Sequence, residues 1–179
     1  MMSFKYKLKT YYLKKIKKMS DSDILIEHLR KIGTKVGNNC FIFSDKVETT
    51  EPYLVSIGNN VTISYNVCFN THDDSVEAYY KKDTLIVGKI DIGDNCFIGV
   101  GSILLPGVTL ADNCIVGAGS VVTKSFEKGS VIAGVPAKRI CSVEQLYEKN
   151  KDYIIDTTGK GFQERKDYIL LHPEMMKSV

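Results

Sequence analysis

The sequence predicts an all-β-dominated protein in which short parallel strands wind into a β-helix of six-residue repeats, with helices at the N-terminal and C-terminal ends. Three observations lead to this prediction. Large apolar residues recur at every sixth position over much of the chain, small or β-branched residues follow them four positions later, and Gly, Asp and Asn fill many of the places between. Such self-similarity at a fixed period is typical of repeat architectures.

The six-residue step runs through two long stretches and one short piece, Val36 and Ile42. An α-helix repeats its apolar face every 3.6 residues, so a step of six favours a short strand followed by a turn. Three such units close one triangular coil, with the large residue filling its interior. The large residues of the long stretches are Ile57, Ile63, Phe69, Ile92, Ile98, Leu104, Leu110, Val116 and Val122.

The residues four positions later are also expected to point inward, where less room remains. Gly and Asn at the corners supply the positive φ that a sharp turn needs. Successive coils stack at a parallel-strand spacing of about 4.8 Å, so backbone groups pair along the stack. Because no C-x-x-C pair occurs and several cysteines lie at inward positions, we expect packing roles for them. The smaller inward residues are Cys40, Val61, Val67, Cys96, Ser102, Val108, Cys114 and Ser120.

The chain divides into three predicted segments. Residues 1–33 form a basic and helical segment, residues 34–140 form the β-helix, and residues 141–179 form a helical segment. Two insertions interrupt the repeat, one at 46–56 and a long extruded loop at 73–89. Loops this long inside a compact fold are usually functional or mobile.

Helical patterns mark the two ends. The N-terminal one covers 22–32 and stops at Gly33, a suitable C-terminal cap. A capping box that begins at Ser142 opens another helix, expected to run to about Ile155. The segment 162–171 receives no assignment. Such helices would cover the open ends of the coil, which otherwise present unpaired strand edges.

Charge is unevenly distributed along the chain. The net charge is only +3, yet residues 1–18 carry seven lysines and no acid. This basic arm suits a membrane surface, an acidic glycan or a partner, or it is a solvated lead-in. The sequence contains no apolar run of about 18 residues and no secretory signal, so we expect a cytoplasmic protein without a transmembrane segment. No motif suggests nucleic-acid binding.

The segment from Ile90 to Ile140 contains G-A-G-S-V-V-T-K followed by G-V-P-A-K. It resembles the hexapeptide-repeat acyltransferases, the family that includes maltose and galactoside acetyltransferases and many polysaccharide O-acetyltransferases. The resemblance is dense over this segment and weaker from Val36 to Asp74. It implies a left-handed β-helix, a homotrimer with active sites between neighbouring subunits, and acetyl-CoA as the acyl donor without a metal.

The resemblance also implies roles for individual residues. His72, in F-N-T-H-D-D, matches the catalytic histidine. Phe97 stands where many members carry a tryptophan beside the acyl-transfer site, and Val135 replaces an asparagine common in the family. The positions expected to bind the donor are Phe97, Gly99, Val100, Gly117, Ala118, Thr123, Lys124, Lys138 and Arg139, with the last three facing its phosphates.

The chemistry explains why a histidine suits this role. An acceptor hydroxyl is a poor nucleophile at neutral pH, and an imidazole with a pKa near 6.5 can take its proton. Of the three histidines, only His72 closes a repeat and opens a loop. Backbone N–H groups around Gly99 and Val100 are candidate oxyanion donors, although Gly99 equally suits a corner. The candidate acceptor-binding residues are Asn70, Asp73 and Asp74, of which the two acids could orient the acceptor or the imidazole, or be solvated.

The acceptor predicted from family frequency is a sugar or glycan hydroxyl. An antibiotic, an amino-sugar nitrogen or serine are alternatives, and a non-catalytic β-helix scaffold is a further one. A zinc enzyme of the carbonic anhydrase type would need about three histidines, whereas His28 and His172 lie outside the repeats. A dinucleotide enzyme is disfavoured because the G-x-G pairs lack a third glycine and a following helix.

Overall fold

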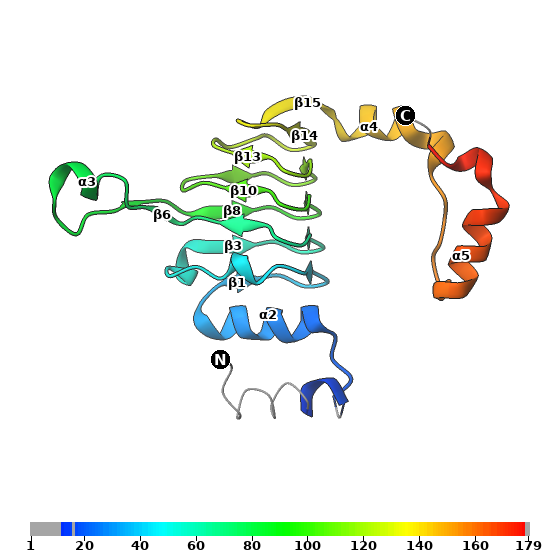
Figure 1. Cartoon of the computed structure of the whole chain (residues 1–179), viewed down its shortest axis with the longest axis horizontal. Helices are drawn as coiled ribbons and strands as arrows, with labels where there is room; N and C mark the ends of the chain where they lie inside the picture. Colours follow the sequence, from blue (N-terminus) through cyan, green and yellow to red (C-terminus); the bar gives the residue numbers. More distant parts are fainter. Residues whose placement is uncertain (1–11, 16, 178–179) are drawn as a thin grey trace. The chain divides into compact units, whose positions relative to one another are not determined.

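The computed structural model describes residues 12–15 and 17–177, and it divides into two compact units. The described part of the first unit ends at Val143, and the second unit begins at Glu144. The first unit contains every strand of the protein's described residues and is a three-sided prism (Figure 1).

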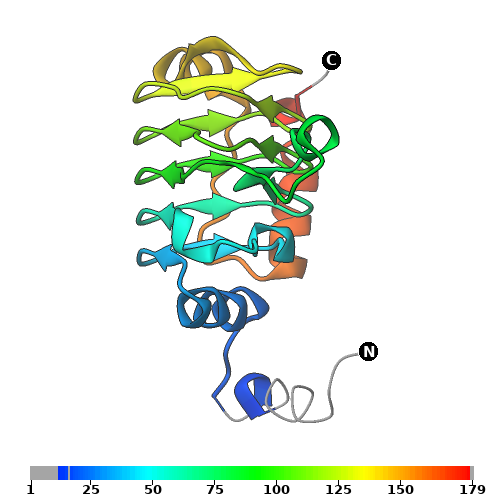
Figure 2. The same ribbon diagram turned by 90° about the vertical axis from the view of Figure 1, so that its left-hand side faces the viewer.

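Three sheets form the sides of the prism, and their strands are parallel except for the last one of side two. Each complete coil passes from side one to side two to side three, and successive coils stack in register. Figure 2 shows these coils as successive layers of strands. Side one consists of β1 (Lys35–Val36), β3 (Val55–Ile57), β8 (Ile90–Ile92) and β11 (Thr109–Leu110). Side two consists of β2 (Phe41–Ile42), β4 (Thr62–Ile63), β9 (Phe97–Ile98), β12 (Ile115–Val116), β14 (Ser130–Ala133) and β15 (Lys138–Ser142). Side three consists of β5 (Cys68–Phe69), β10 (Ile103–Leu104) and β13 (Val121–Val122).

The interior confirms the six-residue prediction. All nine large residues of the long stretches are at most 4 % exposed, and they stack in register, as when Ile63 lies beside Ile98. The smaller inward residues are buried too, and the cysteines among them pack against the neighbouring coil. The Cys40, Cys96 and Cys114 thiols donate to the backbone carbonyls of Gly58, Ala111 and Glu127 at 3.1, 3.3 and 3.2 Å.

The corners confirm the predicted turn chemistry. Asparagines occupy the left-handed region at the corner after side one, with φ between 55° and 59° at Asn39, Asn60, Asn95 and Asn113. Asn tolerates this region better than other non-glycine residues because its short polar side chain can bond locally. Here the side chains also link successive coils, since Asn60 Nδ2 donates to Asn95 Oδ1 at 3.0 Å.

Helix α2 (Asp21–Ile32) covers the N-terminal end of the prism, as predicted. Its N-cap is Ser20, which forms a capping box with Asp23, and its C-cap is Gly33 at φ 115°. Leu29 is fully buried against the core of the first coil. At the other end of side two, the edge of β14 is paired by the antiparallel strand β15. A reversed strand therefore protects this edge, where the sequence had suggested a helix.

The two insertions meet at the corner after side three, where Glu51 of the first contacts His72 at the start of the second. The first contains two short 3₁₀ turns, η1 (Asp45–Val47) and η2 (Pro52–Leu54). The second is a ribbon of antiparallel strands, β6 (His72–Asp73) and β7 (Ile86–Val87), with the short helix α3 (Glu77–Tyr80) at its tip. Figure 1 shows this ribbon projecting from the prism, as the sequence predicted for 73–89.

The second unit is helical. Helix α4 (Val143–Asn150) begins directly after Ser142, as predicted, but ends earlier and continues as the 3₁₀ turn η3 (Lys151–Tyr153). The segment left without assignment forms α5 (Phe162–Leu171), followed by η4 (Pro173–Met175). Among the described residues, no helix has the length and apolar character needed to cross a membrane.

Candidate active site

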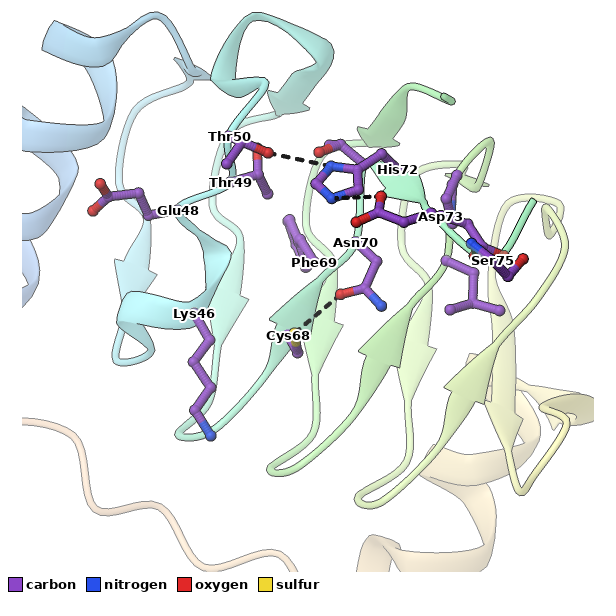
Figure 3. Close-up of a pocket in the computed structure, with 14 residues that line it drawn as sticks. Lys46, Glu48, Thr49, Thr50, Cys68, Phe69, Asn70, His72, Asp73 and Ser75 are labelled. Atoms are coloured by element: carbon purple, nitrogen blue, oxygen red, sulfur yellow. Dashed lines mark hydrogen bonds and ion pairs between the residues drawn. The ribbon is translucent and has the colours of Figure 1, made fainter. Parts of the chain in front are cut away.

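A cleft of about 800 Å³ lies beside His72, at the corner after side three. Strand β5 ends at Phe69, and the chain leaves the prism at His72 to form the ribbon. The imidazole is thus fixed at the base of the ribbon, and its side chain is 29 % exposed. Other lining residues include Lys46, Thr49, Thr50, Cys68, Asn70, Asp73, Asp74, Leu105 and Pro106. Figure 3 shows several of these side chains around the imidazole.

Glu51 is the residue that sequence reasoning missed. Its carboxylate lies 2.8 Å from His72 Nδ1, and its side chain is only 15 % exposed. Thr71 Oγ1 donates to the same carboxylate at 2.7 Å. Because an ionised carboxylate can only accept, Nδ1 carries the proton of this hydrogen bond, and Nε2 faces the cleft. Thr50 Oγ1 is a weaker neighbour of Nδ1, at 3.2 Å (Figure 3).

The acids around the imidazole change its basicity. The hydrogen bond that Nδ1 donates to Glu51 is the main cause that raises the pKa of His72. Burial opposes this effect, and the negative charges of Glu51, Asp74 and Asp73 raise the pKa further. The same bond to His72 is the main reason that the pKa of Glu51 is lowered. Glu51 and His72 therefore attract each other whenever both are charged.

The two predicted acids differ in their contacts. Asp74 Oδ1 lies 3.4 Å from His72 Nε2, so it contacts the nitrogen that faces the cleft. Asp73 instead accepts the backbone N–H of Ser75 at 2.8 Å, and this bond is the main reason that the pKa of Asp73 is lowered. Asn70 also lines the cleft, where its side-chain oxygen accepts from the Cys68 thiol at 3.3 Å.

The residues expected near the acyl-transfer centre lie elsewhere on the same chain. Phe97 stands on side two and is 42 % exposed, while Val100 is 47 % exposed at the corner after side two. Ala118 stacks on Val100 at this corner, where Gly119 N donates to Val100 O at 2.8 Å. None of these three lines the His72 cleft. Side three separates them from the imidazole within one chain.

Gly99 has a structural reason to be glycine. Its N–H donates to Val116 O at 2.8 Å, so it is already used in the ladder between coils and does not act as the oxyanion donor suggested by the sequence. A Cβ on Gly99 would lie 2.6 Å from Ala118 N, because the next coil approaches closely. The positive φ at this corner belongs to Gly101, at 71°. Gly117 likewise donates its N–H, to Ile132 O at 2.8 Å.

The predicted cations lie farther along the prism. Thr123 and Lys124 follow β13 at the same corner as His72, two coils away, which corresponds to about 10 Å. Lys124 Nζ lies 5.7 Å from the centre of the Phe126 ring. Lys138 and Arg139 are exposed on β15, at the end of the prism opposite α2.

The local chemistry of the cleft is suited to general-base catalysis. One imidazole is oriented by a half-buried carboxylate and presents its second nitrogen to an open cleft. No group of three or more His, Cys, Asp or Glu able to hold a metal ion occurs within 12–15 and 17–177.

The chain is similar to a known protein family, to characterised proteins and to a solved structure. A family model described as the hexapeptide repeat of succinyl-transferase matches residues 89–124. Protein CapG of Staphylococcus aureus is 46 % identical over 170 residues, which cover 91 % of this chain and 95 % of CapG. Galactoside O-acetyltransferase of Escherichia coli K12 is 34 % identical, over 66 % of this chain and 57 % of that protein. The crystal structure of a maltose O-acetyltransferase from Clostridium difficile 630 is similar with a TM-score of 0.52 and 27 % identity, covering 69 % of this chain and 76 % of the other.

Proposed function

This chain belongs to the hexapeptide-repeat acyltransferase family, and we propose that it moves an acetyl group from acetyl-CoA to a hydroxyl of a sugar or glycan, with His72 as the general base. The observation that carries the proposal is that His72, which lines a cleft of about 800 Å³, is paired behind the cleft with Glu51 at 2.8 Å. An ion pair with a purely structural role does not require Nε2 of the histidine to face an open cleft.

The transfer follows from this geometry. Glu51 holds the proton on Nδ1, so Nε2 can accept the proton of the acceptor hydroxyl as the oxygen attacks the thioester carbonyl. The new C–O bond forms, the C–S bond breaks, and the imidazolium gives its proton to the leaving sulfur. Glu51 stabilises the imidazolium by its charge, as the carboxylate does in other histidine-based catalytic sites. Asp74, 3.4 Å from Nε2, is placed to accept from a second group of the acceptor.

The exposed residues along the prism fit a CoA donor. Gly119 lies at the corner after side two with φ 67°, and a Cβ placed there would meet open space. A ligand can therefore approach this backbone closely. Lys124, Lys138 and Arg139 supply positive charge for the phosphates of the donor, to which charge-assisted hydrogen bonds are strong. When bound, acetyl-CoA would supply an activated acyl group, and the chain's own residues orient it and move the proton.

We also infer that the β-helix winds in the left-handed sense and that the complete site lies between copies in a homotrimer. The separation of His72 from Phe97 and Val100 supports the second point, since one chain holds the base and the expected donor-binding face on different sides. Mixing two inactive variants, His72→Ala and Ala118→Trp, is expected to restore activity in mixed assemblies. Failure of co-expressed variants to recover any activity would contradict a shared site.

The proposed acceptor and bond type can be tested together. Release of CoA thiol from acetyl-CoA is measured with sugars, amino sugars and serine as acceptors, and the product is then treated with hydroxylamine. We expect sugar-dependent thiol release and an acetyl group that hydroxylamine removes, because an ester is cleaved where an amide survives. A resistant product would show transfer to nitrogen, and the absence of release with every acceptor would contradict the proposed activity.

A further inference from the structure

We propose that the acceptor is an extended, neutral glycan, and that a second cleft beside Phe43 and Tyr65 binds a sugar unit away from the reacting hydroxyl. This inference rests on the proposed function and names the acceptor class for that same site. The second cleft measures about 560 Å³ and lies near the N-terminal end of the prism.

The centre of this cleft is a pair of exposed aromatic rings. Phe43 and Tyr65 stack with their ring centres 5.2 Å apart and an interplanar angle of 28°, yet they are 41 % and 61 % exposed. Each ring turns one face toward the other, so the outer face of the stack remains as a flat apolar platform, with the Tyr65 hydroxyl at the edge of its ring. The C–H face of a pyranose ring complements such a platform, because both surfaces are apolar and nearly flat.

Polar groups surround the platform at hydrogen-bonding positions for sugar hydroxyls. Asp45 is exposed on the wall of the cleft, and its carboxylate can accept from two neighbouring hydroxyls. Asp21 also lines the cleft, and Lys14 is its ion-pair partner. Leu25 and Ile42 form the apolar floor. A few polar groups around an apolar floor are typical of small-molecule sites.

The linings of the two clefts include residues that are adjacent in the chain. Asp45 lines the second cleft and the next residue, Lys46, lines the His72 cleft. Two chain segments, 43–50 and 65–72, run side by side between the clefts. They begin at the stacked rings, are joined where Ser44 Oγ donates to Val67 O at 2.8 Å, and end at the imidazole.

The length of this path sets the size of the acceptor. From Tyr65 the chain turns at Asn66, where φ is 56°, and then runs from Val67 through β5 to Asn70, an extended stretch that spans about 10 Å. This distance is longer than a single pyranose ring. A monosaccharide can occupy the His72 cleft alone, whereas only a chain of several sugars reaches the aromatic pair.

The charge along the path favours a neutral chain. Asp45, Glu48, Asp73 and Asp74 all line the two clefts, and Lys46 is the one cation among the residues that line them. Like charges repel at this range, so a glycan with many carboxylates or phosphates would bind poorly.

The test compares neutral acceptors of increasing length. Acetyl transfer is measured to glucose, maltose and maltopentaose, and to pentagalacturonate as an anionic chain of equal length. We expect kcat/KM to rise by on the order of tenfold from glucose to maltopentaose, which is the size of effect that aromatic stacking gives. The anionic chain is expected to be a poorer acceptor than maltopentaose by a similar factor.

Variants then locate the effect. The double change Phe43→Ala and Tyr65→Ala is expected to abolish the gain with length while leaving the rate with glucose unchanged. Tyr65→Phe keeps the stacked ring and should keep the gain. Tyr147→Ala removes an exposed aromatic ring of the second unit, 57 % exposed, and serves as the matched control. The molar mass in solution is measured for each variant.

The outcomes distinguish failure of the second cleft as a sugar site from failure of the proposed function. Transfer to glucose and maltopentaose with equal kcat/KM would overturn the second cleft and leave the proposed function standing. A lower molar mass of the double variant would show that the aromatic pair joins copies of this chain, and would also overturn it. No transfer to any of these acceptors would instead contradict the proposed function for this class of sugar.

Discussion

Removing the charge of Glu51 while keeping its shape is the sharpest perturbation of the proposed base. Glu51→Gln can still accept a hydrogen bond from Nδ1 but carries no charge, whereas Glu51→Ala removes both. In the structure this bond is 2.8 Å long and forms in a half-buried setting, while Thr50 at 3.2 Å is a poor substitute. A hydrogen bond to a charged group of this kind corresponds to on the order of 10- to 100-fold in rate. We therefore expect kcat to fall by that factor in Glu51→Ala and by less in Glu51→Gln.

The pH dependence of acetyl transfer shows whether the Glu51 charge raises the pKa of His72. Only the neutral imidazole can accept a proton, so activity rises with pH through the raised pKa of His72. Loss of the Glu51 charge removes the main cause of that raised pKa, and the acid limb of the pH profile should move to lower pH in Glu51→Gln. The assay is kcat/KM for acetyl transfer between pH 5 and pH 9.

Glu48 provides the matched control. It also lines the cleft, but its carboxylate contacts His28 at 3.0 Å instead of His72. Glu48→Gln should leave both the rate and the acid limb in place. A Glu51→Ala enzyme with unchanged kcat and an unchanged acid limb would refute the role of Glu51 as the positioning residue for His72.

Two further predictions concern the stacking of coils and the binding of the donor. Gly99→Ala should lower the free energy of unfolding by about 1–3 kcal/mol, because its Cβ would lie 2.6 Å from the backbone of the next coil. Gly161→Ala is the control, since no atom lies within 4 Å of its Cβ, and it should have a far smaller effect. Urea denaturation measures both changes. Equal effects of the two changes would count against close stacking as the reason for glycine. Lys124→Ala should weaken CoA binding about tenfold and reduce the thermal shift produced by CoA, while Lys128→Ala should keep it. A full thermal shift in the Lys124 variant would remove this lysine from the donor site.

The prism could be predicted from the sequence because its determinants are local and repeated. In a three-sided coil, a large apolar residue at each sixth position points into the interior of the prism. Leu104 and Val116 are accordingly fully buried. Asn at positions such as Asn60 and Asn95 marks corners because few other residues tolerate the left-handed region. The fixed spacing between the buried residues and the corner asparagines therefore determines where each strand and turn lies.

The features that the sequence did not predict depend on contacts outside the repeat. Glu51 lies in an insertion that has no repeat, so nothing in its spacing predicts that it meets His72, 21 residues later. The signal was an acid immediately before Pro52, in a stretch already identified as an insertion. The strand β15 follows a reversal at Gly134, where φ is 102°, and reversals of this kind carry no periodic signal. The distance between His72 and Phe97 depends on which side of the prism each one faces.

The most direct test of the central claim is the turnover of His72→Ala. If this imidazole takes the proton of the acceptor, thiol release from acetyl-CoA should fall by roughly 10²- to 10⁴-fold, while the molar mass of the assembly and the thermal shift with CoA stay as in the unmodified protein. Unchanged thiol release in that variant, with an intact assembly, would contradict the account.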